Sequence, residues 1–174
     1  MPAASLARLK ESLRDHGVSF DVVEHARSDS ATAEALAVNL PAEQAAETVV
    51  LRTPGGYRLA VVCGSDRLDL HKAAEAFGIG RHQLRFASEA DMARSFPVYE
   101  VGAIPPIGPD TPAELIDLRL LDYGLVLCPA GDHEHSLWSI RSTSSASRER
   151  GRWICARTNR LRSDRASGRV SRAW

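Results

Sequence analysis

The chain has 174 residues, of which 44% are hydrophobic and 25% are charged, values typical of one globular domain with a substantial core. No apolar run approaches the ~20 residues needed to span a bilayer, and residues 1–10 lack the apolar core of a signal peptide. The three cysteines, Cys63, Cys128 and Cys155, are odd in number and far apart, which argues against a disulfide framework or a CxxC metal site. Cys63 and Cys128 end apolar runs and are expected to be reduced core thiols. We therefore expect a cytoplasmic protein.

The formal net charge of zero conceals an asymmetry along the chain. Residues 1–140 carry 12 basic and 20 acidic residues, a net charge of −8, whereas residues 141–174 carry 10 arginines and two acids, a net charge of +8. Because the second segment is rich in Arg and Ser and poor in apolar residues, it cannot bury much surface. We expect one domain over residues 1–140 and a disordered tail over residues 141–174. The tail composition fits either an arm that binds nucleic-acid phosphates or a divergent C-terminus such as a reading-frame change produces.

Hydrophobic spacing and turn residues predict short helices and strands in a mixed order. The first predicted helix contains Leu6, Leu9 and Leu13 and stops at Gly17. Four further helices are predicted over residues 31–38, 41–46, 68–77 and 88–96. The predicted strands cover residues 18–25, 48–53, 57–63, 84–87, 115–117, 125–128 and 137–140. The strands at 48–53 and 57–63 flank Pro54-Gly55-Gly56, which favours a β-hairpin. Because several strands are adjacent along the chain, the pattern indicates an α+β fold rather than βαβ units.

Residues 101–108 contain two prolines between two glycines. Pro105 and Pro106 have a fixed φ and no backbone N–H, and Gly102 and Gly108 allow backbone geometries that a side chain would block. The segment is therefore predicted to be a rigid loop. Composition alone favours a stiff connector, and a pocket wall is the alternative.

Polar groups gather between two predicted strands in residues 131–136. If this stretch were extended, His133 and His135 would share one face, with Asp132 and Glu134 on the other. Such a His pair is one hypothesis for a metal-dependent hydrolase, although two ligands are few for a metal site. The alternative is a solvated hairpin loop.

Four segments, taken in this order, resemble the YbaK/ProX family of aminoacyl-tRNA editing domains. They are the hairpin residues 48–52 and 56–62, the helix start at residues 66–72, the GxxxPxG-like segment at residues 101–108, and the glycine loop at Gly131. The resemblance runs from about Leu6 to Ile140 and favours the pocket wall over the connector. It implies an α/β (α+β) fold with a central mixed sheet, partly barrel-like, and surrounding helices.

The resemblance also implies a freestanding trans-editing deacylase that hydrolyses the ester of mischarged tRNA without a metal or other cofactor. Its partner would be the 3′ end of an aminoacyl-tRNA, with an aminoacyl-tRNA synthetase as a second candidate. The implied catalytic residues are Glu47 and Thr48. The implied substrate-binding residues are Gly102, Ala103, Ile104, Pro105, Gly108, Gly131, Asp132 and His133.

Glu47 departs from the family pattern, which has a lysine, its main functional residue, directly before the threonine of the first hairpin strand. An ammonium group stabilises developing negative charge, and a carboxylate reverses the sign of that interaction. Glu47 could act as a general base if its pKa were raised, and Lys72, Arg52 or His133 could supply the missing positive charge. The alternative is a catalytically impaired module that binds tRNA, a small ligand or a protein.

Overall fold

A computed structural model describes residues 2–15, 17–107 and 113–140. Gly108, Cys155 and the expected tail at 141–174 lie outside the described residues.

Every predicted helix and strand is present within the described residues, with shifted ends. The helices are α1 (Pro2–Asp15), α2 (Ala31–Ala37), α3 (Leu70–Phe77) and α4 (Glu89–Ser95). The predicted helix at 41–46 is a 3-10 turn, η1 (Ala42–Gln44), and two further 3-10 turns, η2 (Arg81–Gln83) and η3 (Leu118–Asp122), were not predicted. The strands are β1 (Phe20–Glu24), β2 (Ala46–Thr53), β3 (Gly56–Cys63), β4 (Arg85–Phe86), β5 (Leu115–Ile116), β6 (Leu125–Pro129) and β7 (His135–Ile140).

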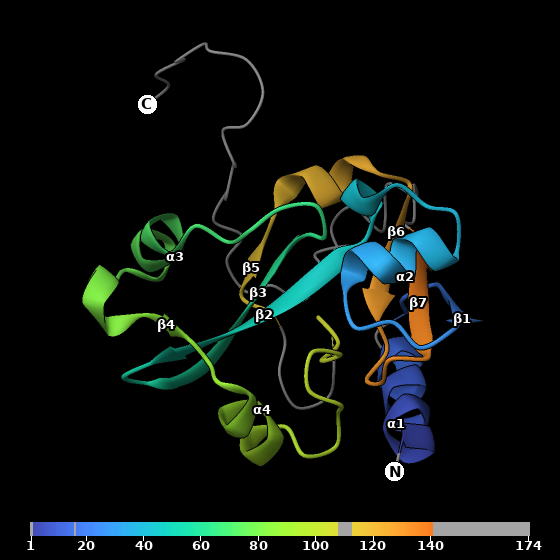
Figure 1. Ribbon diagram of the computed structural model, residues 1–174, viewed down its shortest axis with the longest axis horizontal. Coiled ribbons are helices and arrows are strands. Elements are labelled where there is room, and N and C mark those ends of the chain that lie inside the picture. Colours follow the sequence, from blue (N-terminus) through green and yellow to red (C-terminus); the bar gives the residue numbers. More distant parts are fainter. Residues whose placement is uncertain (1, 16, 108–112, 141–174) are drawn as a thin grey trace.

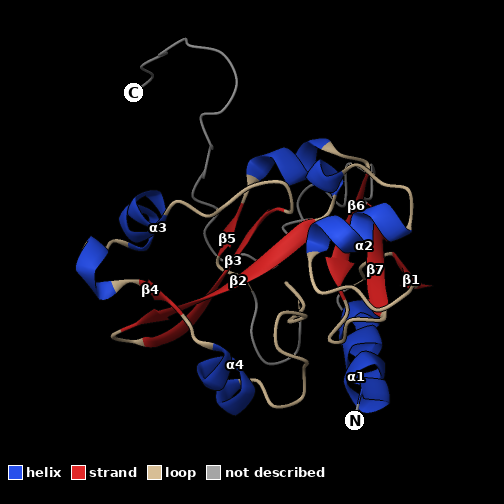
Figure 2. Cartoon of the chain, viewed as in Figure 1, coloured by secondary structure: helices blue, strands red, loops and turns tan. Residues whose placement is uncertain are grey.

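The strands form two sheets, which lie on different sides of Figure 1. The three-stranded sheet has the order β1-β7-β6, and the four-stranded sheet has the order β4-β2-β3-β5. All strand pairs are antiparallel except β3 and β5, which are parallel. A parallel bridge between Ala45 and Leu127 joins the two sheets. The α+β class with mixed strands is thus confirmed, and the sheet is divided in two (Figure 2).

Local sequence signals explain where the elements begin and end. Gly56 closes the hairpin with a φ of 114°, a conformation that favours glycine. Ser88 and Asp91 form the predicted capping box of α4, in which each side chain accepts a hydrogen bond from the other residue's backbone N–H at 3.1 Å. Asp69 caps α3 by accepting hydrogen bonds from two backbone N–H groups. No described helix is both long and apolar enough to cross a bilayer.

The main core lies between α1, one face of the β2–β3 hairpin and strands β6 and β7. The leucines predicted for α1 form its buried stripe, and Cys63 and Cys128 are buried in the same cluster, as predicted. Its largest members include Leu9, Leu13, Leu59, Phe96, Ile104 and Leu137. A second cluster on the other face of the hairpin packs Leu51 and Ala60 against Ala73 and Ala74 of α3.

Alternate residues of β2 therefore face different parts of the molecule. Val50 packs in the main core and Leu51 packs against α3. Because side chains alternate along a strand, Thr48 shares the face of Val50, and Glu47 shares the face of Leu51. The two residues predicted to be catalytic therefore project from opposite faces of one strand.

Candidate functional site: three loops joined by His133

Three loops far apart in the sequence meet beside the three-stranded sheet. The backbone N–H of Ser28 donates to the carbonyl oxygen of His133 at 3.0 Å, and the backbone N–H of Glu100 donates to the carbonyl oxygen of Gly131 at 2.9 Å. Arg27 also pairs with the Glu100 carboxylate at 3.1 Å. The segments 25–28, 99–103 and 131–133 are thus tied together by backbone and charged contacts. We call them the loop cluster.

The His133 side chain lies at the centre of the loop cluster and is buried. Its Nδ1 atom lies 2.9 Å from the carbonyl oxygen of Ser28, and its Nε2 atom lies 2.9 Å from that of Val101. A carbonyl oxygen only accepts hydrogen bonds, so both contacts are hydrogen bonds only when both ring nitrogens carry a proton. The carboxylate of Glu100 lies 3.9 Å from Nε2. The ring thus clamps two loops together, and in either neutral tautomer one of its N–H groups donates to one of the two carbonyl oxygens.

Residues 100–103 form a tight turn that presents one backbone donor. The Ala103 N–H donates to the Glu100 carbonyl at 3.0 Å, and Gly102 has a φ of 91°, as the third residue of a type II turn requires. Because a trans peptide directs its C=O and N–H oppositely, the Val101 carbonyl held by His133 directs the Gly102 N–H away from the imidazole. Gly102 is exposed, and its N–H has no hydrogen-bond acceptor among the described residues. The turn therefore offers a fixed donor to a ligand oxygen.

Residues 131–134 connect the antiparallel strands β6 and β7, so the hairpin-loop interpretation is right about the connection. It is wrong about solvation at residues 131–133, which are buried, whereas Glu134 is exposed. Gly131 has a φ of 108°, and a Cβ atom there would lie 2.9 Å from the Tyr99 ring. The loop packs this closely because glycine leaves room for Tyr99 and adopts the left-handed backbone.

The predicted alternation of faces between 132 and 135 is also wrong. Strand β7 begins only at His135, and the preceding residues turn, so that Asp132 Oδ1 lies 2.9 Å from His135 Nδ1. Burial acts to raise the pKa of Asp132, but hydrogen bonds from Glu134 and His135 outweigh it and the net shift is downward. Asp132 thus caps the turn as a carboxylate. The His133 nitrogens face carbonyl groups, which does not suit the predicted His-x-His metal site.

The predicted substrate-binding residues occupy two kinds of position. Ala103, Ile104 and Pro105 are buried in the core, whereas Gly102 is exposed. Within residues 102–105, only the backbone around Gly102 is therefore accessible to a ligand. The substrate-binding role of these residues remains a prediction.

Thr48 and Glu47 differ in environment as well as in face. The Thr48 hydroxyl is buried and has no hydrogen-bond partner among the described residues. The Glu47 side chain is exposed, but neighbouring chain removes part of its water and raises the pKa of its carboxyl. It has neither an ion pair nor a hydrogen bond within the described part of the chain.

Only one of the three cations considered as substitutes for the family lysine lies in the loop cluster. His133 does, whereas Arg52 pairs with Asp91 at 3.2 Å near the other end of β2. Lys72 belongs to α3, which packs on the opposite face of the sheet from Thr48. Among these three, only His133 contacts the loops.

Sequence reasoning missed a buried polar chain beside the loop cluster. Ser136 Oγ lies 3.2 Å from Glu34 Oε2 and 2.9 Å from His25 Nε2. Burial raises the pKa of Glu34, an effect that His25 and the Ser136 hydroxyl only partly oppose. The sequence could have predicted the burial of Glu34, because residues 31, 34 and 35 lie on one face of a helix and the other two are alanines.

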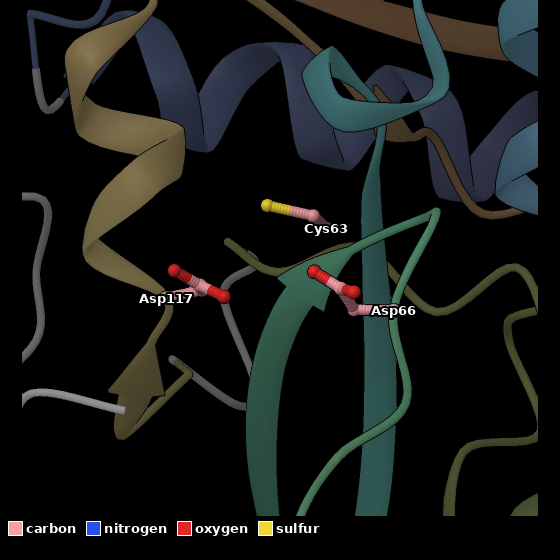
Figure 3. Close-up of side chains that lie close together, drawn as sticks. All are labelled: Cys63, Asp66 and Asp117. Carbon is pink, nitrogen blue, oxygen red and sulfur yellow. The ribbon is translucent and has the colours of Figure 1, made fainter. Parts of the chain in front are cut away.

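Cys63, Asp66 and Asp117 form the one three-residue cluster with metal-ligand spacing among the described residues (Figure 3). Their ligand atoms lie within 4.8 Å of one another. However, the Arg119 guanidinium ion-pairs with both carboxylates, and burial together with Asp117 raises the pKa of Cys63 to about 11. A guanidinium therefore occupies the cation position, and the thiol is protonated. The cluster is an ion-pair network rather than a ready metal site.

Comparison with known proteins places this α+β domain in a family. A model described as "Aminoacyl-tRNA editing domain" matches residues 25–140. The chain belongs to this family, and the resemblance to YbaK/ProX domains is confirmed.

Solved structures share the fold. A crystal structure of "a putative trans-editing enzyme for prolyl tRNA synthetase" is 26% identical, with a TM-score of 0.72, and the match covers 91% of this chain and 97% of that one. A structure from work on "epitope backbone grafting" onto scaffold proteins is 25% identical, with a TM-score of 0.71 and coverage of 91% and 97%. The "hypothetical protein APE2540" has 19% identity, a TM-score of 0.65 and coverage of 74% and 85%, and so shows the fold alone. No curated protein matches the chain.

Proposed function

We propose that this chain is a freestanding aminoacyl-tRNA deacylase, which hydrolyses the ester between the 3′ end of a tRNA and a wrong amino acid. Membership of the editing-domain family supports the substrate class. In this proposal residues 1–140 form the editing domain, and the reaction takes place in the cytoplasm. Because a similar structure is named for prolyl tRNA synthetase, mischarged prolyl tRNA is the first substrate to test, and that synthetase is the first candidate partner.

The observation that carries the proposal is the Gly102 N–H held in place by the His133 clamp. Ester hydrolysis passes through a tetrahedral intermediate whose oxygen carries negative charge, and a preorganised backbone N–H stabilises that charge. Removal of one such donor in other enzymes costs about 10²–10³ in rate. The His133 ring lies behind the turn and contacts the Val101 carbonyl, so it does not occupy the Gly102 donor.

The test is hydrolysis of a panel of mischarged tRNAs by the wild-type chain, beginning with tRNA(Pro) that carries amino acids other than proline and including correctly charged prolyl-tRNA. The proposal expects turnover of at least one mischarged tRNA well above spontaneous hydrolysis, with the correct ester spared. Absence of turnover across the panel, by a protein shown to be folded, would overturn it.

A second candidate is a binding module of the same fold, and Glu47 favours it. A carboxylate stands where the family has a lysine, and it repels the oxyanion that the lysine would stabilise. Glu47→Lys separates the two candidates when both proteins are assayed on the same panel. Turnover by the variant alone supports the binding module, whereas turnover by the wild-type chain excludes it. Affinity for a non-hydrolysable aminoacyl-adenosine analogue and for uncharged tRNA then tests binding. Failure to bind either would leave only a protein partner.

A further inference from the structure

A groove of about 440 Å³ lies where the tip of the β2–β3 hairpin meets η2 and β4. It is a polar surface, and none of its lining residues belongs to the loop cluster. Its lining residues are Arg52, Thr53, Pro54, His82, Gln83 and Arg85.

Two arginines face each other across this groove. Arg52 of β2 and Arg85 of β4 are register partners in an antiparallel pair, so their side chains project from the same face of the sheet. Like charges directly opposite each other destabilise a strand pair. Arg85 is exposed and has no ion pair or hydrogen bond within the described part of the chain. The two guanidinium groups therefore concentrate positive charge on this face of the sheet.

Asp91 compensates only part of this charge. Its Oδ1 atom lies 3.2 Å from Arg52 Nη1 and 3.8 Å from Arg94 Nη2, and it also accepts a hydrogen bond from the Tyr57 hydroxyl at 3.0 Å. Arg52 and Arg94 thus share one carboxylate, which leaves the charge of Arg85 uncompensated. This local positive charge stands on a domain whose residues 1–140 carry a net charge of −8. A partner attracted here is anionic.

We propose that the groove between Arg52 and Arg85 binds a backbone phosphate of tRNA, an inference that rests on the proposed function. A phosphodiester carries one negative charge and oxygen acceptors that suit the planar donors of arginine. A bound phosphate would relieve the repulsion between Arg52 and Arg85. Asp91 would hold the Arg52 guanidinium in position, and the remaining N–H groups of Arg52 would be available to the phosphate.

The position of the groove specifies which part of the RNA it takes. Thr48 and Arg52 lie on the same face of β2, four residues apart, which is about 13 Å along a strand. With Thr48 taken as the ester end of the site, as the sequence analysis predicts, the bound phosphate belongs to a nucleotide a short distance upstream of the terminal adenosine. An aminoacyl-adenosine alone would then not reach it.

The experiment measures binding of uncharged tRNA over a range of salt concentrations for the wild-type chain and for Arg85→Ala. Loss of one phosphate contact is expected to lower affinity roughly five- to eightfold at 0.1 M salt and to reduce the salt slope by about 1. Arg85→Lys should retain part of the affinity. The matched control is Arg14→Ala on α1, far from β4 in Figure 1, where the guanidinium only covers the Phe20 ring. Thermal melting confirms that each variant is folded.

The outcomes for the groove and for the enzyme are separate, because uncharged tRNA cannot be hydrolysed. Equal affinity and equal salt slope for Arg85→Ala and the wild-type chain would overturn the proposal that the groove binds a tRNA phosphate, even if the chain is a deacylase. A loss confined to Arg85→Ala would support the groove, even if no mischarged tRNA is hydrolysed. Failure of the wild-type chain to bind tRNA at all would overturn the groove, whereas the deacylase would still be decided by hydrolysis of the mischarged panel.

Discussion

The Nε2 atom of His133 lies 2.9 Å from the carbonyl oxygen of Val101, a residue 32 positions away in the sequence. This contact ties the loop before β7 to the glycine-proline loop, and through the Val101–Gly102 peptide it fixes the direction of the one exposed donor described for the site.

His133→Ala should leave the Gly102 N–H without its orienting contact. We expect kcat for deacylation to fall by as much as about 10²–10³, the loss seen when an oxyanion donor is removed, with a smaller change in KM. Steady-state kinetics on mischarged tRNA measure the changes in kcat and in KM separately. His71→Ala, which alters an exposed histidine on α3, is the control. Unchanged kcat in a folded His133→Ala protein would contradict the clamp.

Glu34→Gln should make the fold more stable at neutral pH. A raised pKa means that the folded state holds the Glu34 proton more tightly than the unfolded state does. The stability from this group is therefore complete below the unfolded-state pKa near 4.5 and is lost as pH rises through the folded-state pKa. Because glutamine mimics the protonated acid, its advantage should vanish in acid.

Urea unfolding between pH 4 and pH 8 measures this difference, with the exposed Glu75→Gln on α3 as the matched control. A Glu34→Gln protein that is less stable than wild type at pH 7 would show that the ionised carboxylate is the favoured form.

Arg119→Met should destabilise the fold, because it leaves Asp117 buried without its cation. Breaking a fully buried pair costs about 3–5 kcal/mol. Since the Arg119 side chain is 39% exposed, solvent screening reduces the expected cost to about 1–3 kcal/mol. Arg67→Met, at an exposed residue with no described partner, is the control, and Asp117→Asn added to Arg119→Met should recover part of the loss. Equal unfolding free energies for wild type and Arg119→Met would refute this account.

Gly131→Ala should disturb the buried loop in two ways. Alanine would have to adopt a φ of 108°, and its Cβ would lie 2.9 Å from the Tyr99 ring. A strained residue of this kind costs about 1–3 kcal/mol. Gly124→Ala has open space around the new methyl group and no positive φ, so its melting temperature should stay close to that of wild type. Similar melting temperatures for the two variants would show that the loop tolerates the side chain.

The fold could be predicted where the signals were local. The turn residues at 54–56 fixed the hairpin, and the spacing of three leucines fixed the buried face of α1. The loop cluster could not be predicted in the same way, because Ser28, Val101 and His133 meet only after the two sheets have formed.

The error at residues 132–135 has a related cause. The prediction used the two-residue alternation of side chains in an extended strand. In the structure the chain turns here, because Asp132 accepts hydrogen bonds from the backbone N–H groups of Glu134 and His135. The resemblance did locate the two glycine loops, but it could not show that Glu47 and Thr48 lie on opposite faces of β2.

Strand β2 carries Thr48, a predicted catalytic residue, near one end and Arg52 of the proposed phosphate groove near the other. If Thr48 acts on the ester, backbone geometry sets the distance between ester and phosphate. A small aminoacyl ester would reach only Thr48, whereas the 3′ end of a tRNA would reach both Thr48 and Arg52. The chain would then recognise its substrate by length, without reading a single base.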